Sequence, residues 1–241
     1  MKILFIGYSP ISKTLISAFK DIHELVLVEL DELSELTQHN DSDGCIISIN
    51  DDSFDSSQLI DVIDKLPIYM PIMIKNLLPI PIIDKIKEMY PDHSIVISPD
   101  FHNQQYIVIG GEDPDCFWQD LFQSSLPNCK MILNCSDSEA ALVKYAEIGF
   151  FATKNAYFNQ LYDICNQCGL DFNIVRQVLT TNSKINSDYS MVPNADGTRG
   201  LNETVFTSHI NEFISWTDEI QATSLILKSI TKYNDEIKNN Q

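Results

Sequence analysis

The polar residues best placed to do chemistry lie in an apolar, aromatic-rich segment between residues 140 and 168. Lys144, Lys154 and Asn159 stand there among apolar neighbours, and a lysine amine can serve as a general base. A simpler interpretation competes, because lysine stems lie along apolar helices with the amine in water, and an amide can be satisfied within its own helix. The pattern leaves both interpretations open.

Cysteine and histidine patterns give weaker indications. Cys165 and Cys168 have the spacing of a redox pair but fall inside a predicted helix, where two small side chains one turn apart are typical of packing. The five histidines are dispersed without the spacing that a zinc site requires, so we expect no metal site. The six cysteines are scattered without paired metal spacing, which favours a reducing, cytoplasmic setting.

A candidate phosphate-binding turn follows the first apolar run and reads GYSPIS from Gly7 to Ser12. A dinucleotide-binding turn reads G-x-G-x-x-G, because the glycines let the backbone approach the pyrophosphate. Gly7 is present, but Ser9 and Ser12 stand at the other two glycine positions. Glu29 follows about 20 residues later, where an acidic side chain binds ribose hydroxyls. Ser9 before Pro10 is also a good helix start, which explains this turn without a ligand.

These candidates are positioned by a predicted α/β fold. Short β-rich runs alternate with helical patterns in the first half, which favours a mostly parallel, doubly wound sheet. Near residue 136 the apolar spacing changes to a helical period. We therefore predict a Rossmann-like, NAD-binding-type domain over residues 1–135 and an all-helical dimerisation domain over residues 136–241. The predicted strands are KILFIG, LVLVEL, CIISI, IMIKNL, SIVIS and YIVIGG.

The helical domain is predicted in more detail. One long helix begins near Ser138, a shorter one follows Gly169, and a last helical region runs from about Ser208 to Lys238. A polar loop over residues 182–202 separates them. The long helix has one inward face, formed by Ala141, Tyr145, Ile148, Ala152, Asn155, Phe158, Tyr162 and Cys165. Shorter helices are predicted in the first domain over Asp55–Leu66 and Ile82–Met89.

The charge balance argues against two classes of partner. The chain has 16 basic and 34 acidic residues, which gives a formal net charge of −18. Such a surface repels the phosphates of nucleic acid and of anionic membranes. No apolar run in the sequence is long enough to span a bilayer, and we interpret the opening MKILFIGYSP as a strand rather than a signal peptide.

Several segments, in the right order, resemble the UDP-glucose/GDP-mannose dehydrogenase family. HELVLVELDE is similar to the family's second strand with its ribose-binding acid, and SPDFHNQQ is similar to its N-P-E-F-L segment. The stretch from Ala141 to Leu179 is similar throughout to the central helical domain, whose pattern is K-Y-x-x-N-x-F-x-A-x-K-I-x-F-x-N-E. SKINSDYSMVPNADGTRGL is similar to the loop that leads to the family's nucleophile.

The resemblance implies roles for individual residues. It places the family's catalytic lysine at Lys154, its water-orienting asparagine at Asn159 and its catalytic carboxylate at Asp100. It implies that Lys184 and Arg199 bind the substrate, which in this family is a nucleotide sugar. NAD is the implied cofactor, with the glycine, serine and glutamate positions named above as its binding residues.

The departures from the family pattern are equally specific. The family's loop continues as G-F-G-G-x-C-F-P-K-D, whose cysteine forms a thioester, whereas this chain reads GLNETVFTSH. Val205 stands at the nucleophile position, and valine has no nucleophilic atom. The resemblance covers the first two-thirds of the family's architecture, without its C-terminal nucleotide-sugar domain.

Three classes of function follow from these observations. The chain is an active NAD-dependent nucleotide-sugar dehydrogenase, an inactive relative retained for binding or assembly, or an oxidoreductase with altered chemistry, such as a single alcohol oxidation. The missing nucleophile and glycines favour the second class, and we expect weak NAD binding or none. We also expect a two-fold homodimer built from residues 140–180 and the final helices, because the long helix has aromatic residues on more than one face.

Overall fold

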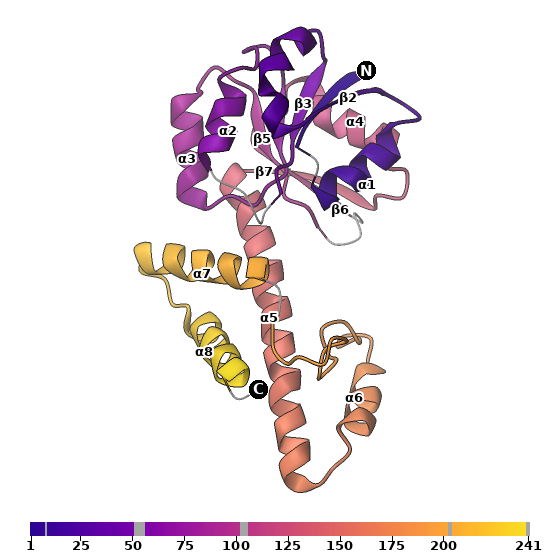
Figure 1. The fold of residues 1–241 in the computed structure, drawn as a ribbon, viewed down its shortest axis with the longest axis vertical. Helices are drawn as coiled ribbons and strands as arrows, with labels where there is room; N and C mark the ends of the chain where they lie inside the picture. Colours follow the sequence, from indigo (N-terminus) through magenta and orange to yellow (C-terminus); the bar gives the residue numbers. More distant parts are fainter. Residues whose placement is uncertain (8, 51–55, 102–105, 202–203, 240–241) are drawn as a thin grey trace. The chain divides into compact units, whose positions relative to one another are not determined.

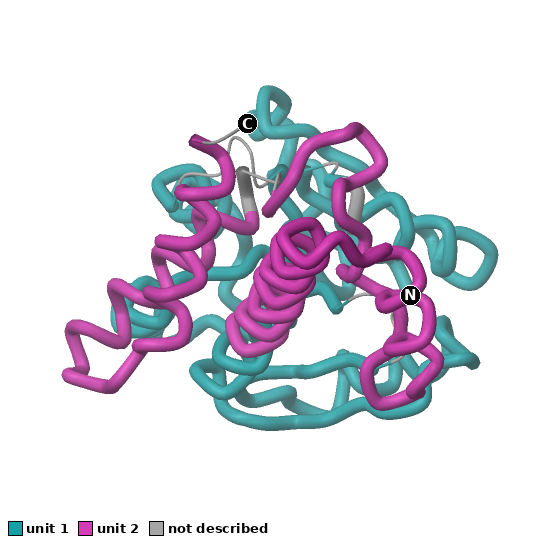
Figure 2. The backbone as a smooth tube through the Cα atoms, turned by 90° about the horizontal axis from the view of Figure 1, so that it is seen from below, with its two compact units in different colours: residues 1–144 teal, residues 145–241 magenta. Residues whose placement is uncertain are grey.

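The structure is a computed structural model, and it divides into two compact units, residues 1–144 and residues 145–241 (Figure 2). The sequence predicts a domain boundary after residue 135, where the last strand ends, whereas the two compact units divide between residues 144 and 145, within a helix. The residues that the structure describes are 1–7, 9–50, 56–101, 106–201 and 204–239.

The first unit is built on a seven-stranded sheet in the order β2-β1-β3-β4-β5-β6-β7 (Figure 1). Neighbouring strands run parallel except for β5 and β6, which are antiparallel. This arrangement confirms the predicted Rossmann-like, mostly parallel sheet. The strands are β1 (Lys2–Ile6), β2 (Glu24–Val28), β3 (Gly44–Ile47), β4 (Ile72–Ile74), β5 (Ile95–Ile97), β6 (Tyr106–Gly110) and β7 (Met131–Cys135).

Helices cover both faces of this sheet, with α2 and α3 on one side and α1 and α4 on the other (Figure 1). Strands β3, β4 and β5 are buried along their whole length, as their continuous apolar runs predict for a sheet covered on both faces. Trp118 and Phe122 of α4 pack with Phe19 of α1 in a core cluster of this unit. The helical segments are α1 (Pro10–Phe19), η1 (Leu30–His39), α2 (Ser56–Ile63), α3 (Ile80–Met89), η4 (Pro114–Cys116) and α4 (Phe117–Ser125).

Four elements of this unit, η1, η4, α4 and β7, were not predicted from the sequence. Segment η1 is a 3-10 helix, and its leucines at residues 30, 33 and 36 follow the three-residue period of such a helix rather than the 3.6-residue period of an α-helix. Strand β7 lies at the edge of the sheet, so most of its side chains are exposed and its sequence lacks the buried run by which the other strands were predicted. The predicted helix over Asp55–Leu66 is observed from Ser56, and Asp55 itself lies outside the described residues.

The second unit consists of helices and loops in its described part. Helix α5 (Asp137–Cys168) starts at the end of the first unit and continues into the second, followed by α6 (Phe172–Thr180), α7 (Thr204–Glu219) and α8 (Leu225–Asn239). The predicted inward face of the long helix is buried except for Tyr162, which is half-buried. The last helical region, predicted as one stretch, is two helices, with a break between Glu219 and Leu225. In the described residues, no helix is both long and apolar enough to span a membrane.

Candidate functional site

The turn after β1 lies where a doubly wound sheet binds its ligand. The chain passes from β2 on one side of β1 to β3 on the other, and ligands bind beyond the carboxyl ends of the strands at such a switch point. Gly7 adopts a left-handed φ of +82° there, and a Cβ atom built on it would lie 2.6 Å from the carbonyl oxygen of Ser48. Glycine is therefore required at residue 7 by contact with the end of β3, independently of any ligand.

Serine side chains fill this turn and bond to one another. The Oγ atoms of Ser9 and Ser48 are 2.6 Å apart, and the Ser12 hydroxyl donates to the carbonyl oxygen of Gly7 at 3.2 Å. The backbone N–H of Ser12 donates to Ser9 Oγ at 3.3 Å, which is the helix cap predicted from Ser9 and Pro10. All three serines are buried. The backbone N–H of Ser12 and the hydroxyls of Ser9 and Ser12 therefore make their hydrogen bonds within the chain, whereas the N–H groups at this turn of a dinucleotide-binding protein face the pyrophosphate.

Glu29 follows β2 as predicted, with its side chain exposed. Its backbone N–H donates to Oε2 of Glu32 at 3.3 Å, at the start of η1. The geometry keeps this carboxylate accessible, but the start of a 3-10 helix explains its position equally well.

A buried lysine that was not among the predicted site residues lies at the same edge of the sheet. Lys75 follows β4 directly, is 1% exposed and donates from Nζ to Oγ of Ser98, which follows β5, at 3.1 Å. Burial lowers the pKa of Lys75 to about 8, with the charge of Asp100 opposing this effect and that of Lys144 reinforcing it. The sequence signal for Lys75 was its place immediately after a three-residue apolar strand.

Lys144 and Asp100 complete this lysine cluster, which we define as Lys75, Ser98, Asp100 and Lys144. Nζ of Lys144 lies 5.4 Å from the ring centroid of Phe101, the residue that follows Asp100. The electrostatic effects of Asp100 and Lys144 on Lys75 place the two side chains near the same ammonium group. Within the first unit, Asp100 therefore acts on Lys75, whereas Lys154 belongs to the second unit.

In the second unit, Lys154 and Asn159 make separate sets of contacts. The Lys154 ammonium donates to Oδ1 of Asn186, and burial lowers the pKa of Lys154 against the opposing charge of Asp188. Asn159 is 1% exposed, and its amide donates to the carbonyl oxygen and to Oδ1 of Asn155 at 3.0 and 3.1 Å. With its donors used inside α5, Asn159 is poorly placed to orient a water molecule.

Arg199 is held by the protein itself. Its Nε donates to Oδ1 of Asn159 at 3.3 Å, and NH2 lies 2.7 Å from Oδ1 of Asp163. The guanidinium also lies over the ring of Tyr162, 4.8 Å from its centroid. These contacts engage the Arg199 guanidinium, which the family resemblance predicts to bind the substrate. Lys184, the other predicted substrate-binding residue, is exposed in the loop before α7.

Helix α8 completes this arrangement, which we call the Arg199 network and define as Asn159, Asp163, Arg199 and Tyr233. The Tyr233 hydroxyl donates to Oδ2 of Asp163 at 2.9 Å. Burial and the Asp163 carboxylate together raise the pKa of Tyr233 to about 12, so the phenol stays protonated as a donor. The structure thus brings Asn159 and Arg199, both predicted as site residues, together as hydrogen-bond partners of each other.

A cavity of about 400 Å³ lies beside this network in the second unit. It is lined by Asn155, Tyr189, Asn194, Asp196 and Phe206, among others. The Tyr189 ring stacks on Phe151 at a centroid distance of 4.5 Å, and the lining of the cavity combines aromatic rings with amides and a carboxylate. Among the described residues no group of three or more His, Cys, Asp or Glu side chains is placed to hold a metal ion.

Comparisons with known proteins agree on the fold. A UDP-glucose dehydrogenase from the hyperthermophilic archaeon Pyrobaculum islandicum superposes with a TM-score of 0.76 at 15% identity, covering 98% of this chain and 68% of that one. A 3-hydroxyisobutyrate dehydrogenase from Mycobacterium tuberculosis, solved with L-serine, gives a TM-score of 0.71 at 11% identity, covering 96% and 92%. Identities this low establish the fold alone.

The sequence comparison is more specific. No curated protein matches this sequence. Residues 138–236, however, match the model of the central domain of the UDP-glucose/GDP-mannose dehydrogenase family. This segment begins within the first turn of α5 and ends within α8, so it includes nearly all of the second unit. Residues 138–236 are therefore similar to the central domain of the UDP-glucose/GDP-mannose dehydrogenase family.

Proposed function

We propose that this protein does not oxidise nucleotide sugars and that its dehydrogenase fold is retained for binding or assembly. The observation that carries the proposal is the closed phosphate turn, in which Ser9 and Ser48 bond at 2.6 Å across the switch point of the sheet. A pyrophosphate approaching this turn has to break that bond and displace two buried side chains. NAD is therefore bound weakly or not at all.

The residues around the proposed substrate site support the same conclusion. Val205, at the position of the family's thioester-forming cysteine, follows the first residue of α7, and its side chain lies outside the described residues. Whatever its orientation, a valine side chain cannot attack an aldehyde. Asn159 and Arg199, which the family resemblance assigns to water and substrate, bond to each other instead.

A second candidate function is favoured by the lysine cluster. An active oxidoreductase with altered chemistry needs a base beside an alcohol, and a lysine amine can serve as that base. Lys144, half-buried beside Phe101, is the member of the cluster that a substrate could reach, since Lys75 is fully buried. NAD would accept the hydride in such a reaction, so this candidate also requires the cofactor to bind.

None of the six cysteines forms a disulfide in the structure, which supports a reducing compartment such as the cytoplasm.

The first test is an assay of UDP-glucose oxidation followed by NADH absorbance. We expect no turnover above background for the wild-type protein, because it lacks a nucleophile and an open phosphate turn. We also expect Val205→Cys to remain inactive, since the Ser9–Ser48 bond is unchanged by that substitution. Turnover by the wild-type protein would overturn the proposal, and its loss in Lys144→Met would then favour the second candidate.

Binding of NAD can be measured separately by calorimetric titration. We expect no micromolar binding to the wild-type protein and a measurable gain in the double variant Ser9→Gly/Ser12→Gly, which restores the glycine pattern and removes both hydroxyls. Glycine is tolerated at a helix N-cap at a cost of a few tenths of a kcal/mol, so the variant should fold. A micromolar dissociation constant for the wild-type protein would contradict the closed-turn interpretation.

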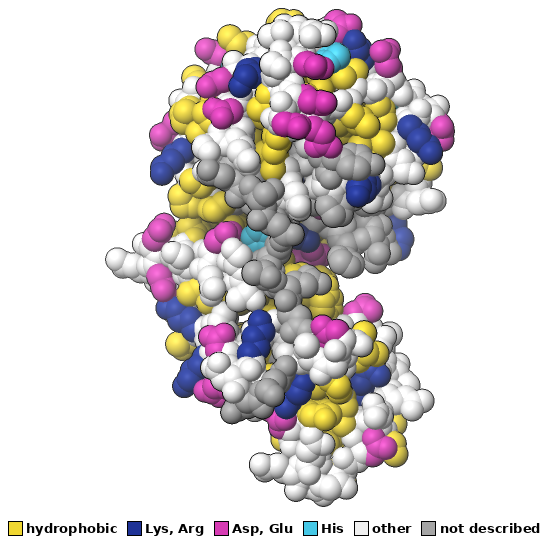
Figure 3. Space-filling view, viewed as in Figure 1, with side chains coloured by type: hydrophobic (Ala, Val, Ile, Leu, Met, Phe, Trp, Pro, Cys, Tyr) yellow, Lys and Arg dark blue, Asp and Glu magenta, His cyan; other side chains and the backbone are white. Residues whose placement is uncertain are grey.

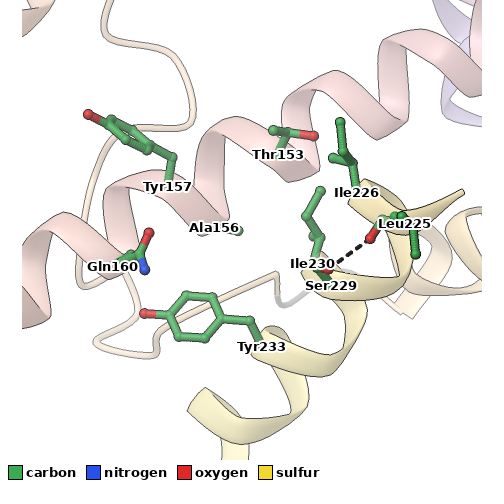
Figure 4. A pocket seen from close by; sticks show the side chains of 9 residues that line it. All are labelled: Thr153, Ala156, Tyr157, Gln160, Leu225, Ile226, Ser229, Ile230 and Tyr233. Carbon is green, nitrogen blue, oxygen red and sulfur yellow. Dashed lines mark hydrogen bonds between the residues drawn. The ribbon is translucent and has the colours of Figure 1, made fainter.

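Assembly is the function that the second unit supports best, and we propose a two-fold homodimer through α5 and the final helices. A groove of about 490 Å³ runs between α5 and α8 (Figure 4). Tyr157 on α5 and Leu225 and Ile226 on α8 line it, and each is more than half exposed. Apolar side chains gathered in this way on a chain of charge −18 favour burial against another protein surface.

Light scattering at micromolar concentration tests the dimer. The single chain has a mass of 27.4 kDa, and we expect about twice that value for the wild-type protein. Tyr157→Glu places a charge in the groove and should yield monomer, whereas Met89→Glu, at an exposed apolar residue of α3 in the first unit, should leave the mass unchanged. A wild-type mass near 27.4 kDa would reject the dimer.

A further inference from the structure

The outer edge of β7 is an unprotected strand edge. Strand β7 ends the sheet and pairs with β6, and no other strand of the described residues pairs with it. Exposed edges of this kind are usually blunted by charged residues, proline or bulges, because their free N–H and C=O groups pair with other chains. The five residues Met131–Cys135 contain no charge and no proline. The edge is therefore open to pairing.

Apolar side chains are exposed along the same strand. Met131 is 50% exposed and Leu133 is 46% exposed, and alternation places them on one face of the sheet. The first turns of α5 cover the far end of that face, where Ala140 packs against Gly110, the residue paired with Cys135. Helix α5 does not cover Leu133, so the side chains of Met131 and Leu133 remain exposed on this face.

The orientation of the backbone shows which groups are available. The carbonyl oxygen of Cys135 accepts a hydrogen bond from the N–H of Gly111 at 2.9 Å, so Cys135 faces β6. Since successive residues of a strand point their N–H and C=O groups to opposite sides, Ile132 and Asn134 present theirs outward. An incoming strand thus finds two outward-facing residues flanking Leu133.

We propose that β7 pairs with β7 of a second copy of this chain, antiparallel and two-fold about Leu133. In this register Ile132 and Asn134 form the hydrogen-bonded pairs, and the two Leu133 side chains meet at the axis in a non-hydrogen-bonded pair. Residues 131 and 135 lie opposite each other, so Met131 is covered by Cys135 of the second copy. The pairing continues the sheet from one copy into the other.

Charge argues for a second copy as the occupant. Lys130 precedes the strand, and Ser136 and Asp137 follow it, so the two-fold register sets each Lys130 opposite Ser136 and beside Asp137 of the other copy. This register brings Lys130 near Asp137 of the second copy, whose carboxylate also pairs with Lys87 of its own chain at 3.2 Å, and no like charges face each other along the five paired residues. Elsewhere acidic side chains gather on the first unit, as on the face shown in Figure 3, and the net charge of −18 opposes contact between copies.

Pairing of this length buries less surface than a permanent interface, so we expect copies to exchange between free and paired states. An engineered disulfide between the two copies can trap this transient pairing covalently. Antiparallel residues in a non-hydrogen-bonded pair have Cα atoms about 4.5 Å apart, which lies within the range that a disulfide bridges. Leu133→Cys therefore tests the register directly, with oxidised glutathione accepting the two electrons.

We expect Leu133→Cys to form a disulfide-linked dimer at least about tenfold faster than Leu27→Cys, because pairing raises the local concentration of the two thiols. Leu27 is the matched control: it is 51% exposed on β2, the strand at the opposite edge of the sheet. Wild-type protein, which has all six native cysteines, supplies the background rate, and peptide mapping should identify residue 133 in both halves of the link.

Two further variants test whether strand pairing, rather than contact through another surface, brings the two thiols together. Asn134→Pro added to Leu133→Cys removes an outward N–H and should return cross-linking to the control rate, with urea denaturation confirming that the chain is folded. Tyr157→Glu added to Leu133→Cys should leave cross-linking unchanged, because the groove and β7 are different surfaces. Equal rates for Leu133→Cys and Leu27→Cys, or links to other cysteines only, would overturn the proposal.

Discussion

Lys75→Met is expected to stabilise the protein by about 2 kcal/mol at pH 7. The pKa of Lys75, lowered by burial from 10.5 to about 8, corresponds to a cost of about 3 kcal/mol for keeping the ammonium charged in the folded state, at about 1.4 kcal/mol per pKa unit. Methionine has nearly the same shape and no charge. Part of the gain is offset because Ser98 loses its hydrogen-bond partner, which costs about 1 kcal/mol.

The pH dependence gives this prediction a second readout. Between pH 8 and 10.5 the unfolded chain holds the Lys75 proton more firmly than the folded chain, so the free energy of unfolding of the wild-type protein rises with pH in this window. The difference between the variant and the wild-type protein should therefore be largest below pH 8 and shrink as pH increases. Urea denaturation at a series of pH values measures it.

Lys85→Met provides the control for this series, since Lys85 is exposed on α3. Its difference from wild type should stay small and flat across the same pH range. If Lys75→Met and Lys85→Met behave alike, burial of the Lys75 ammonium carries no net cost, and its charge is balanced by Asp100 and Ser98.

Gly7→Ala should destabilise the protein by about 3 kcal/mol. An L-residue at φ +82° costs about 1–2 kcal/mol, and the new methyl group would lie 2.6 Å from the carbonyl oxygen of Ser48, which adds a packing cost of about 1–3 kcal/mol. The nearest atom is backbone at the end of β3, so it cannot rotate away. Chemical denaturation measures the change.

Gly197→Ala is the matched control for this substitution. Gly197 has a nearly identical φ of +85°, but nothing lies within 4 Å of the position of its Cβ. We expect it to show the backbone strain alone, about 1 kcal/mol. If the two variants lose equal stability, the contact between Gly7 and Ser48 contributes nothing, and the first glycine of the turn must be explained in another way.

The fold was predictable where burial leaves a strong pattern. Strands β3, β4 and β5 are covered on both faces, so their sequences are continuous apolar runs. The inward face of α5 was predictable because a helix buried on one side repeats its apolar residues every 3.6 positions. Strand β7 lacks both signals, since it lies at the sheet edge with most of its side chains exposed.

The candidate site was less predictable, because its decisive contacts join distant residues. The sequence indicated that Ser9 and Ser12 replace glycines, but not that Ser9 bonds to Ser48, 39 residues away. It likewise pointed to Arg199 and Asn159 without indicating that they bond across 40 residues. Local patterns specify which side chains are present, whereas the packing of strands and helices decides which partners they find.

The Arg199 network has a consequence for local unfolding. Helix α8 holds the end of the preceding loop twice, because Tyr233 bonds to the carboxylate that pairs with Arg199 and Oδ1 of Asn234 accepts the N–H of Leu201 at 2.7 Å. The loop end and α8 are therefore one cooperative segment for hydrogen exchange. The amide of Leu201 becomes accessible to solvent deuterium when α8 opens, so a residue with no regular secondary structure of its own is protected as a helix is.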